Sequence, residues 1–262
     1  MTVPDRIDRP RLSVCTTNYN CGRTLEQHLA SVYALFDEGS FEFVCVDNYS
    51  RDESPAILND WQSRHPNFRW VRRRCSMGRG REVAAGLSSA PHILVVDTDT
   101  VYFPILREFV ERALREFPDL AVQAIYAGVF PRDLWARAGG RRDLNVGEDF
   151  DMWMRIWKIG RMRWYPVPMG ENVKEPNARD ASDYLSSRYT KTERLLRFLR
   201  GQVDLVRLAH YRGLDVETIW RSNTVDLGLG PRRESWFSER RTKGLLSWIK
   251  SSGRAVGEIL DF

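Results

Sequence analysis

Short apolar strands alternate with amphipathic helices through the first hundred residues, and this alternation constrains the fold more than any other feature of the chain. Strands are expected at 12–16, 41–46, 68–71 and 93–96, and helical spacing fills 25–36, 55–61 and 82–90. The strand Phe41–Val46 is mostly apolar, as in parallel strands that helices cover on both faces. The pattern predicts an α/β fold with an open, twisted, mostly parallel sheet flanked by helices.

The second half of the chain is less regular. Helices are expected at 104–117, 131–138, 150–159, 192–210, 215–221 and 242–260, and strands at 120–126 and 163–167. After Pro168 the composition becomes polar before the last helices begin. We therefore expect one α/β domain over residues 1–170, with halves at about 11–100 and 101–170, and a basic, helical C-terminal extension over 171–262.

Charge and hydropathy limit the classes of function. Lys and Arg total 40 against 35 Asp and Glu, and residues 190–262 hold 14 basic and 9 acidic side chains, so the whole excess lies in the C-terminal part. A near-neutral body argues against nucleic-acid binding, which needs a basic face. With no apolar run of about 18 residues and no apolar signal core in MTVPDRIDRP, we expect a cytoplasmic protein. Cys15 and Cys45, in apolar strands, are expected to be buried free thiols.

Three acidic motifs follow apolar strands or precede a helix. Asp97-Thr98-Asp99 places two carboxylates on one turn, an arrangement suited to Mg²⁺ or Mn²⁺ but also to a capping turn. Asp47, at the end of the second strand, suits either a ribose or base contact or an Asx turn. Glu148-Asp149 opens an aromatic helix as either a general base or a helix cap.

The run Gly78-Arg79-Gly80-Arg81 is similar to half of a phosphate-binding loop, but Val83 stands where the third glycine would be. A dinucleotide-binding fingerprint is therefore poorly supported. Arg79 and Arg81 are candidates for contacting a diphosphate, with a solvated surface position as the alternative.

The motifs in their order carry more information than any one alone. The chain reads SVCTTNYNCGRTLEQHLASVY, FEFVCVDNYSRDES, MGRGREVAAGLSSAPHILVVDTDT, AGVFPRDLWARAGG and GEDFDMWMRIWKIG. This series, over about residues 11–168, resembles the family 2 inverting glycosyltransferases of the GT-A fold. The resemblance implies transfer of a sugar from a nucleoside diphosphate sugar to an acceptor, with a divalent metal, Mn²⁺ or Mg²⁺, as cofactor.

The resemblance also implies roles for individual residues. Thr17, Asn18 and Tyr19 would line the nucleotide pocket, and Arg81 would lie near the nucleotide. Asp47 would contact the nucleoside, while Asp97 and Asp99 would hold the ribose and the metal. The later acidic pair, Glu148 and Asp149, would supply the catalytic base, with Asp149 in that role.

The identity of the sugar acceptor is open. The runs GRGREVAAGL and DTDTVYFP resemble those of the subgroup that glycosylates polyprenyl phosphates. A phosphate acceptor is already ionised, so it needs no general base. The expected acceptor is therefore either a glycan hydroxyl or a lipid phosphate. A nucleotidyltransferase and a non-catalytic nucleotide-sugar-binding module are the other readings. Leu245, Leu246, Trp248 and Ile249 lie among basic residues, and this segment would form either a helix on the cytoplasmic face of a membrane or one packed on the domain.

Overall fold

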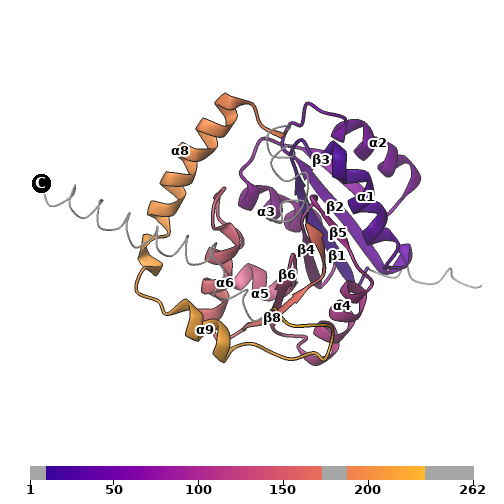
Figure 1. Ribbon diagram of the computed structural model, residues 1–262. Helices are drawn as coiled ribbons and strands as arrows, with labels where there is room; N and C mark the ends of the chain where they lie inside the picture. The colour runs from indigo at the N-terminus through magenta and orange to yellow at the C-terminus, as the bar shows by residue number, and fades with distance from the viewer. Residues whose placement is uncertain (1–9, 173–187, 234–262) are drawn as a thin grey trace, which may run out of the picture.

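The structure is a computed structural model that describes residues 10–172 and 188–233, and its centre is a seven-stranded sheet between two layers of helices (Figure 1). The strands of this sheet are β1 (Leu12–Asn18), β2 (Phe41–Asp47), β3 (Phe68–Arg72), β4 (His92–Val96), β6 (Ala121–Ile125), β7 (Ala127–Pro131) and β8 (Met162–Pro168). Their order is β3-β2-β1-β4-β7-β6-β8. Only β7 runs antiparallel to its neighbours, which confirms the predicted α/β fold with a mostly parallel sheet.

Helices cover both faces of the sheet. One face packs against α1 (Gly22–Tyr33), α2 (Ser54–Arg64) and α4 (Ile105–Glu116), and the other against α3 (Met77–Leu87), α5 (Arg132–Arg137) and α6 (Glu148–Lys158). Two later helices, α8 (Lys191–Arg207) and α9 (Val216–Ser222), follow the gap in the described chain. A two-stranded sheet, β5 (Thr100–Tyr102) with β9 (Gly170–Asn172), lies beside α1. None of the described helices is long and apolar enough to cross a bilayer.

Strand alternation divides the core into two apolar layers. Val14 of β1 points into the layer with α1, α2 and α4, whereas the next residue, Cys15, points into the layer with α3, α5 and α6. Helix α4 joins its layer because Leu106, Phe109 and Val110 recur at helical spacing and are all buried. Cys15 and Cys45 are buried and free, as predicted.

The parallel register brings the polar strand ends to one edge. Asn18, the last residue of β1, pairs with Asp47, the last residue of β2, and on the other side Cys15 of β1 pairs with Val95 of β4. Asp97 directly follows β4. The carboxyl ends of three neighbouring strands therefore present Asn18, Asp47 and Asp97 together, which is where ligands bind in open α/β sheets.

One predicted helix has the wrong bounds, and one strand of the sheet was not predicted. The helix expected at 82–90 begins at Met77, so the Gly78–Arg81 run lies inside a helix and is not a phosphate-binding loop. Strand β7 was not predicted; the segment 127–131 pairs with β4 and β6 after a turn at Tyr126, whose φ is +70°. The expected helix at 242–260, including Leu245–Ile249, lies outside the described residues.

Candidate active site

The end of β2 is built around the carboxylate of Asp47. Its oxygens accept hydrogen bonds from the Asn18 side chain at 2.8 Å and from the backbone N–H of Ser50 at 2.9 Å, and its side chain has no exposed surface. The Ser50 N–H bond closes a turn on the strand end, which is the Asx-type role considered from the sequence. A direct bond from Asp47 to a nucleoside would require exchange of one of these partners.

The Asp97-Thr98-Asp99 segment forms a turn whose middle side chain anchors it to β1. Thr98 is buried, and its hydroxyl donates to the carbonyl oxygen of Thr17 at 3.2 Å. The backbone N–H of Thr100 donates to the carbonyl oxygen of Asp97 at 3.1 Å and closes the turn. The segment is therefore both a capping turn and a platform that holds two carboxylates beside the end of β1.

Asp99, the last residue of this turn, is buried. One of its oxygens accepts a hydrogen bond from Asn172 Nδ2 at 3.0 Å, and the other accepts one from Arg188 Nη1 at 3.1 Å. Arg188 also donates through Nε to the carbonyl oxygen of Tyr19 at 2.9 Å. The tyrosine ring stacks on Tyr189 with centroids 5.4 Å apart. Tyr19 and Asp99 are thus joined through residues that begin the chain after the gap.

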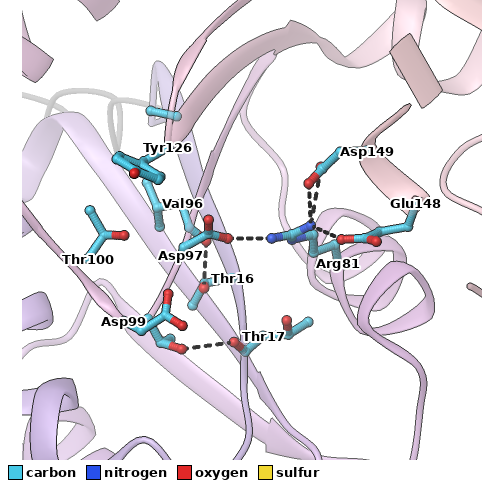
Figure 2. Close-up of polar contacts among 12 residues, drawn as sticks. Thr16, Thr17, Arg81, Val96, Asp97, Asp99, Thr100, Tyr126, Glu148 and Asp149 are labelled. Atoms are coloured by element: carbon cyan, nitrogen blue, oxygen red, sulfur yellow. Dashed lines mark hydrogen bonds and ion pairs between the residues drawn. The ribbon is translucent and has the colours of Figure 1, made fainter. Parts of the chain in front are cut away.

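Arg81 gathers the other carboxylates of the site (Figure 2). Its Nη1 donates to Glu148 Oε1 at 2.7 Å and to both oxygens of Asp149 at 3.2 Å, while its Nη2 donates to Asp97. The guanidinium is almost completely buried. Burial alone would lower the pKa of Arg81, but the three carboxylates raise it above its ordinary value, so this cation is permanent.

Close packing of α3 against β1 brings Arg81 to this position. Ser76 caps the helix by accepting the Arg79 N–H at 3.1 Å. A Cβ on Gly80 would lie 2.4 Å from Thr17 Cγ2, and one on Gly78 would lie 2.2 Å from the carbonyl oxygen of Arg142. The two glycines therefore permit a close helix–strand approach, and the spacing that suggested a phosphate loop serves packing.

Glu148 and Asp149 open α6 and differ in environment. Arg141, whose side chain is fully buried, also donates to Asp149. Burial would raise the pKa of Asp149, but Arg141 and Arg81 lower it to about 2. Burial and the neighbouring Asp149 charge raise the pKa of Glu148 to about 7. Only two guanidinium groups, those of Arg81 and Arg141, neutralise the three carboxyl groups of this cluster. Glu148 is the most deeply buried of the three, so it keeps its proton most readily.

A pocket of about 170 Å³ lies between Asp97 and Asp149. It is lined further by residues of β4, β6 and α6 and by the turn residue Tyr126. A larger cavity, of about 560 Å³, lies at the opposite end of β1 near Leu12 and Leu35, away from every residue of the candidate site. The smaller pocket is therefore the one that the carboxylates could serve.

The structure brings all the predicted site residues to the carboxyl edge of the sheet, in two groups. Thr17, Asn18, Tyr19, Asp47 and Asp99 lie on the β1–β2 side, while Asp97, Arg81, Glu148 and Asp149 meet around the Arg81 guanidinium. Sequence reasoning missed Arg141 and Arg188. Arg141 follows the Gly139-Gly140 pair, and Arg188 precedes the helix expected at 192–210. Neither position stands out in a chain that contains 35 arginines.

The donor groups that could hold a divalent cation are Asp97 and Asp99. Within residues 10–172 and 188–233 no group of three or more His, Cys, Asp or Glu side chains could hold a metal ion. Two carboxylates on one turn nevertheless fit the hard cations Mg²⁺ and Mn²⁺, which complete their coordination shells with water and substrate phosphates. Both carboxylates are bonded to arginines here, so a cation would compete with Arg81 and Arg188.

Solved structures with this fold include enzymes that bind nucleotide sugars. A mannosyltransferase from Pyrobaculum calidifontis, PcManGT, in complex with GDP-Man and Mn²⁺ is 18% identical, with a TM-score of 0.57 over 94% of this chain and 74% of that one. S. aureus TarS 1–349 in complex with UDP-GlcNAc is 14% identical, with a TM-score of 0.55 over 93% of this chain and 88% of that one. These likenesses confirm the GT-A-like fold. No curated protein matches the sequence.

The family model for glycosyl transferase family 2 matches residues 13–184. That range contains the whole seven-stranded sheet except Leu12, the first residue of β1, and it contains Asp47, Asp97, Asp99, Glu148 and Asp149. The match covers well over half of the chain, and the carboxyl-edge site has the position that the sequence motifs predicted. The chain is therefore a member of glycosyl transferase family 2, enzymes that transfer a sugar from a nucleotide sugar.

Proposed function

We propose that this enzyme transfers a sugar, with inversion at the anomeric carbon, from a nucleoside diphosphate sugar to a hydroxyl or phosphate acceptor. The observation that carries the proposal is the meeting of Asp97, Glu148 and Asp149 around Arg81 beside a pocket of about 170 Å³. A donor bound along the strand ends would place its sugar over this pocket, with the acceptor entering from the Asp149 side.

The β1–β2 side of the edge would hold the nucleoside. Thr17 and Asn18 end β1 beside Asp47, and Tyr19, which follows the strand, stacks on Tyr189. In this proposal Asp47 keeps the turn rigid and exchanges one internal hydrogen bond for a ribose or base contact. Asp97 would hold the ribose, and Arg81 would keep Asp97 oriented and neutralise charge near the nucleotide.

A divalent cation, Mn²⁺ or Mg²⁺, would be held by Asp99 and Asp97 together with the donor diphosphate. When bound, it supplies positive charge that stabilises the diphosphate leaving group. Arg188 now donates to Asp99, and displacement of this guanidinium would free the carboxylate oxygen for the donor complex. PcManGT binds GDP-Man and Mn²⁺, which supports the same pairing of nucleotide and metal here.

Asp149 is positioned to act on an acceptor hydroxyl. Arg81 and Arg141 fix both its oxygens, and about a third of its side chain is exposed. An acceptor O–H that donated to this carboxylate would lose its proton to Asp149 as its oxygen attacks the anomeric carbon and the diphosphate leaves on the opposite face. Glu148 would take no proton directly from the acceptor, because it is buried behind Arg81.

A phosphate acceptor is the second candidate, and one observation favours it. Arg141 and Arg81 lower the pKa of Asp149 to about 2, which makes its carboxylate a weak proton acceptor near neutral pH. A lipid phosphate is already ionised and can attack without losing a proton. In that case Asp149 would orient Arg81, which lines the pocket, and the charge of Arg81 would attract the acceptor phosphate.

Thermal shift with UDP, GDP, CDP and dTDP, each with and without Mn²⁺, tests the donor site. A ligand that binds only the folded state raises its stability. One nucleotide should raise the melting temperature only with the metal, and Asp99→Ala should abolish that increment. Asp60→Ala, on the exposed face of α2, is the matched control and should keep it. No stabilisation by any nucleotide under either condition would contradict the proposal.

A further inference from the structure

Helix α8 carries most of the exposed large apolar side chains of the described chain. Ten large apolar side chains are exposed across residues 10–172 and 188–233, and six of them lie on this one helix. They are Leu195, Leu196, Phe198, Leu199, Val203 and Val206, and Phe198 is the most exposed at 62%. A cluster of this kind on a helix marks a binding surface, because isolated surface apolar residues would be scattered.

The six residues form one stripe that faces away from the domain. Leu195, Leu199 and Val206 recur at spacings that fall on one side of a helix, and the other three flank them. Gly201, Asp204 and Leu205 are the buried residues of α8 and lie on the other side. Figure 1 shows α8 at the rim of the molecule, on the side away from α1 and α2. Surface helices normally turn their apolar stripe to the core, so the orientation of α8 is reversed.

The charges of α8 are sorted in the same way. Three exposed basic side chains adjoin the apolar stripe: Lys191 on one margin, and Arg200 and Arg207 on the other. Arg194 and Arg197 lie on the opposite side of the helix. Its two acidic side chains are turned inward. Glu193 accepts a hydrogen bond from the Tyr19 hydroxyl at 2.5 Å, and Asp204 accepts the backbone N–H of Asn145 at 2.7 Å. The outward face of α8 is therefore apolar at its centre and positive at its margins.

We propose that this face of α8 binds the surface of an anionic lipid bilayer. An in-plane helix buries its apolar face at the boundary of headgroups and acyl chains while basic residues contact anionic headgroups, and α8 carries both parts. A symmetric pairing of two α8 helices would bring like charges together, which disfavours a second copy. Residues 234–262 hold five basic and four acidic side chains, so they lack the net negative charge that would complement the basic margins of α8.

Docking through α8 would bring the candidate active site to the membrane surface. Near the N-terminal end of α8, Glu193 accepts a hydrogen bond from Tyr19, which lies on the β1–β2 side of the site. Arg188, just before α8, donates to Asp99. A lipid-linked acceptor, with its phosphate at the headgroup level, would then lie within reach of the site. This consequence for the acceptor rests on the proposed function, whereas binding to lipid does not.

Vesicle co-sedimentation tests the proposal. The full chain is mixed with phosphatidylcholine vesicles and with phosphatidylcholine–phosphatidylglycerol vesicles. We expect binding to the anionic vesicles, weakened by salt. The double variant Leu195→Gln, Leu199→Gln should lower the partition coefficient by about tenfold or more, because the apolar contact is lost. Lys191→Gln with Arg200→Gln should lower it by roughly 30-fold on anionic vesicles only.

The matched control replaces exposed apolar residues elsewhere. Leu87→Gln with Ile159→Gln makes the same chemical change at similarly exposed positions on α3 and after α6, and should leave vesicle binding unchanged. Absence of wild-type binding to anionic vesicles, or equal binding by the Leu195, Leu199 variant, would overturn the proposal. A wild-type dimer that this variant converts to a monomer would overturn it in favour of a second copy. Nucleotide thermal shift on the same variant should be unchanged, so failure of lipid binding and failure of donor binding are distinguishable.

Discussion

The fully buried guanidinium of Arg141 donates a hydrogen bond to the carboxylate of Asp149, eight positions further along the chain. Arg81 reaches the same carboxylate from α3, at 3.2 Å to each oxygen. This double contact keeps Asp149 ionised over the whole physiological range and fixes its orientation toward the pocket. The Arg141–Asp149 pair therefore decides how strong a base the site can offer.

Replacing Arg141 should change the pH dependence of transfer. In the wild type the pKa of Asp149 is about 2, so its protonation limits the rate only at extreme acidity. Arg141→Gln removes one cation, so the pKa should rise toward the ordinary value of an aspartate, and the acid limb of the kcat profile should move to higher pH. Arg141→Lys keeps the charge and should move it less. An acid limb in the same place in both variants would argue against this control of Asp149.

The proton on Glu148 should make stability depend on pH. Its pKa is about 7 in the folded chain, against 4.5 as the ordinary value, so between these pH values the folded state binds more protons than the unfolded state. The free energy of unfolding should therefore fall as pH rises from about 4.5 to about 7. Glu148→Gln mimics the neutral acid and should flatten that slope, as measured by urea unfolding at several pH values. Glu111→Gln, an exposed control on α4, should keep the wild-type slope.

Asp149→Asn separates the two acceptor classes. With a hydroxyl acceptor, loss of the proton acceptor should lower kcat by about 10²- to 10⁴-fold. Donor binding, measured by nucleotide thermal shift, should be retained, because Asp149 does not contact the β1–β2 side. With a phosphate acceptor, kcat should change far less. Equal transfer by Asp149→Asn and the wild type with a hydroxyl acceptor would remove Asp149 from the role of base.

Alanine should lower the stability of the fold at Gly80 but raise it at Gly86, although both glycines lie on α3. A Cβ on Gly80 would lie 2.4 Å from Thr17 Cγ2, so Gly80→Ala should destabilise the fold by about 1–3 kcal/mol and displace Arg81. At Gly86 nothing lies within 4 Å of the added Cβ, and alanine should stabilise the helix by about 0.5–1 kcal/mol. Urea unfolding measures both. A neutral Gly80→Ala would show that α3 and β1 do not pack this closely.

Local patterns in the sequence predicted most of the sheet because its strands are apolar and bounded by polar turns. The expected strand Phe41–Val46 is β2, extended only by Asp47. The early start of α3 was not predicted because Gly78 and Gly80 have low helix propensity. The close approach to Arg142 and Thr17 that requires these glycines is a tertiary contact. Strand β7 was missed because the preceding turn uses Tyr126 at φ +70° without a glycine to mark it.

The acidic residues of the site could be predicted from the sequence, but the arginines that contact them could not. Asp97 and Asp149 could be assigned to the same edge from the strand pattern and the family resemblance. That Arg81 would bridge them depends on how α3 packs, and that Arg188 would reach Asp99 depends on a contact across 89 positions of sequence. Such long-range pairs are set by tertiary structure, and one arginine among 35 carries no local signal.

The most direct test of inverting sugar transfer by this enzyme is ¹H NMR of the anomeric proton during donor turnover. The nucleoside diphosphate sugar chosen by thermal shift is incubated with the enzyme and Mn²⁺, with water or a lipid extract as the source of acceptor. We predict release of the nucleoside diphosphate and first appearance of the sugar with the anomeric configuration opposite to that of the donor. Retention of configuration, or no consumption of a donor that binds tightly, would contradict this prediction.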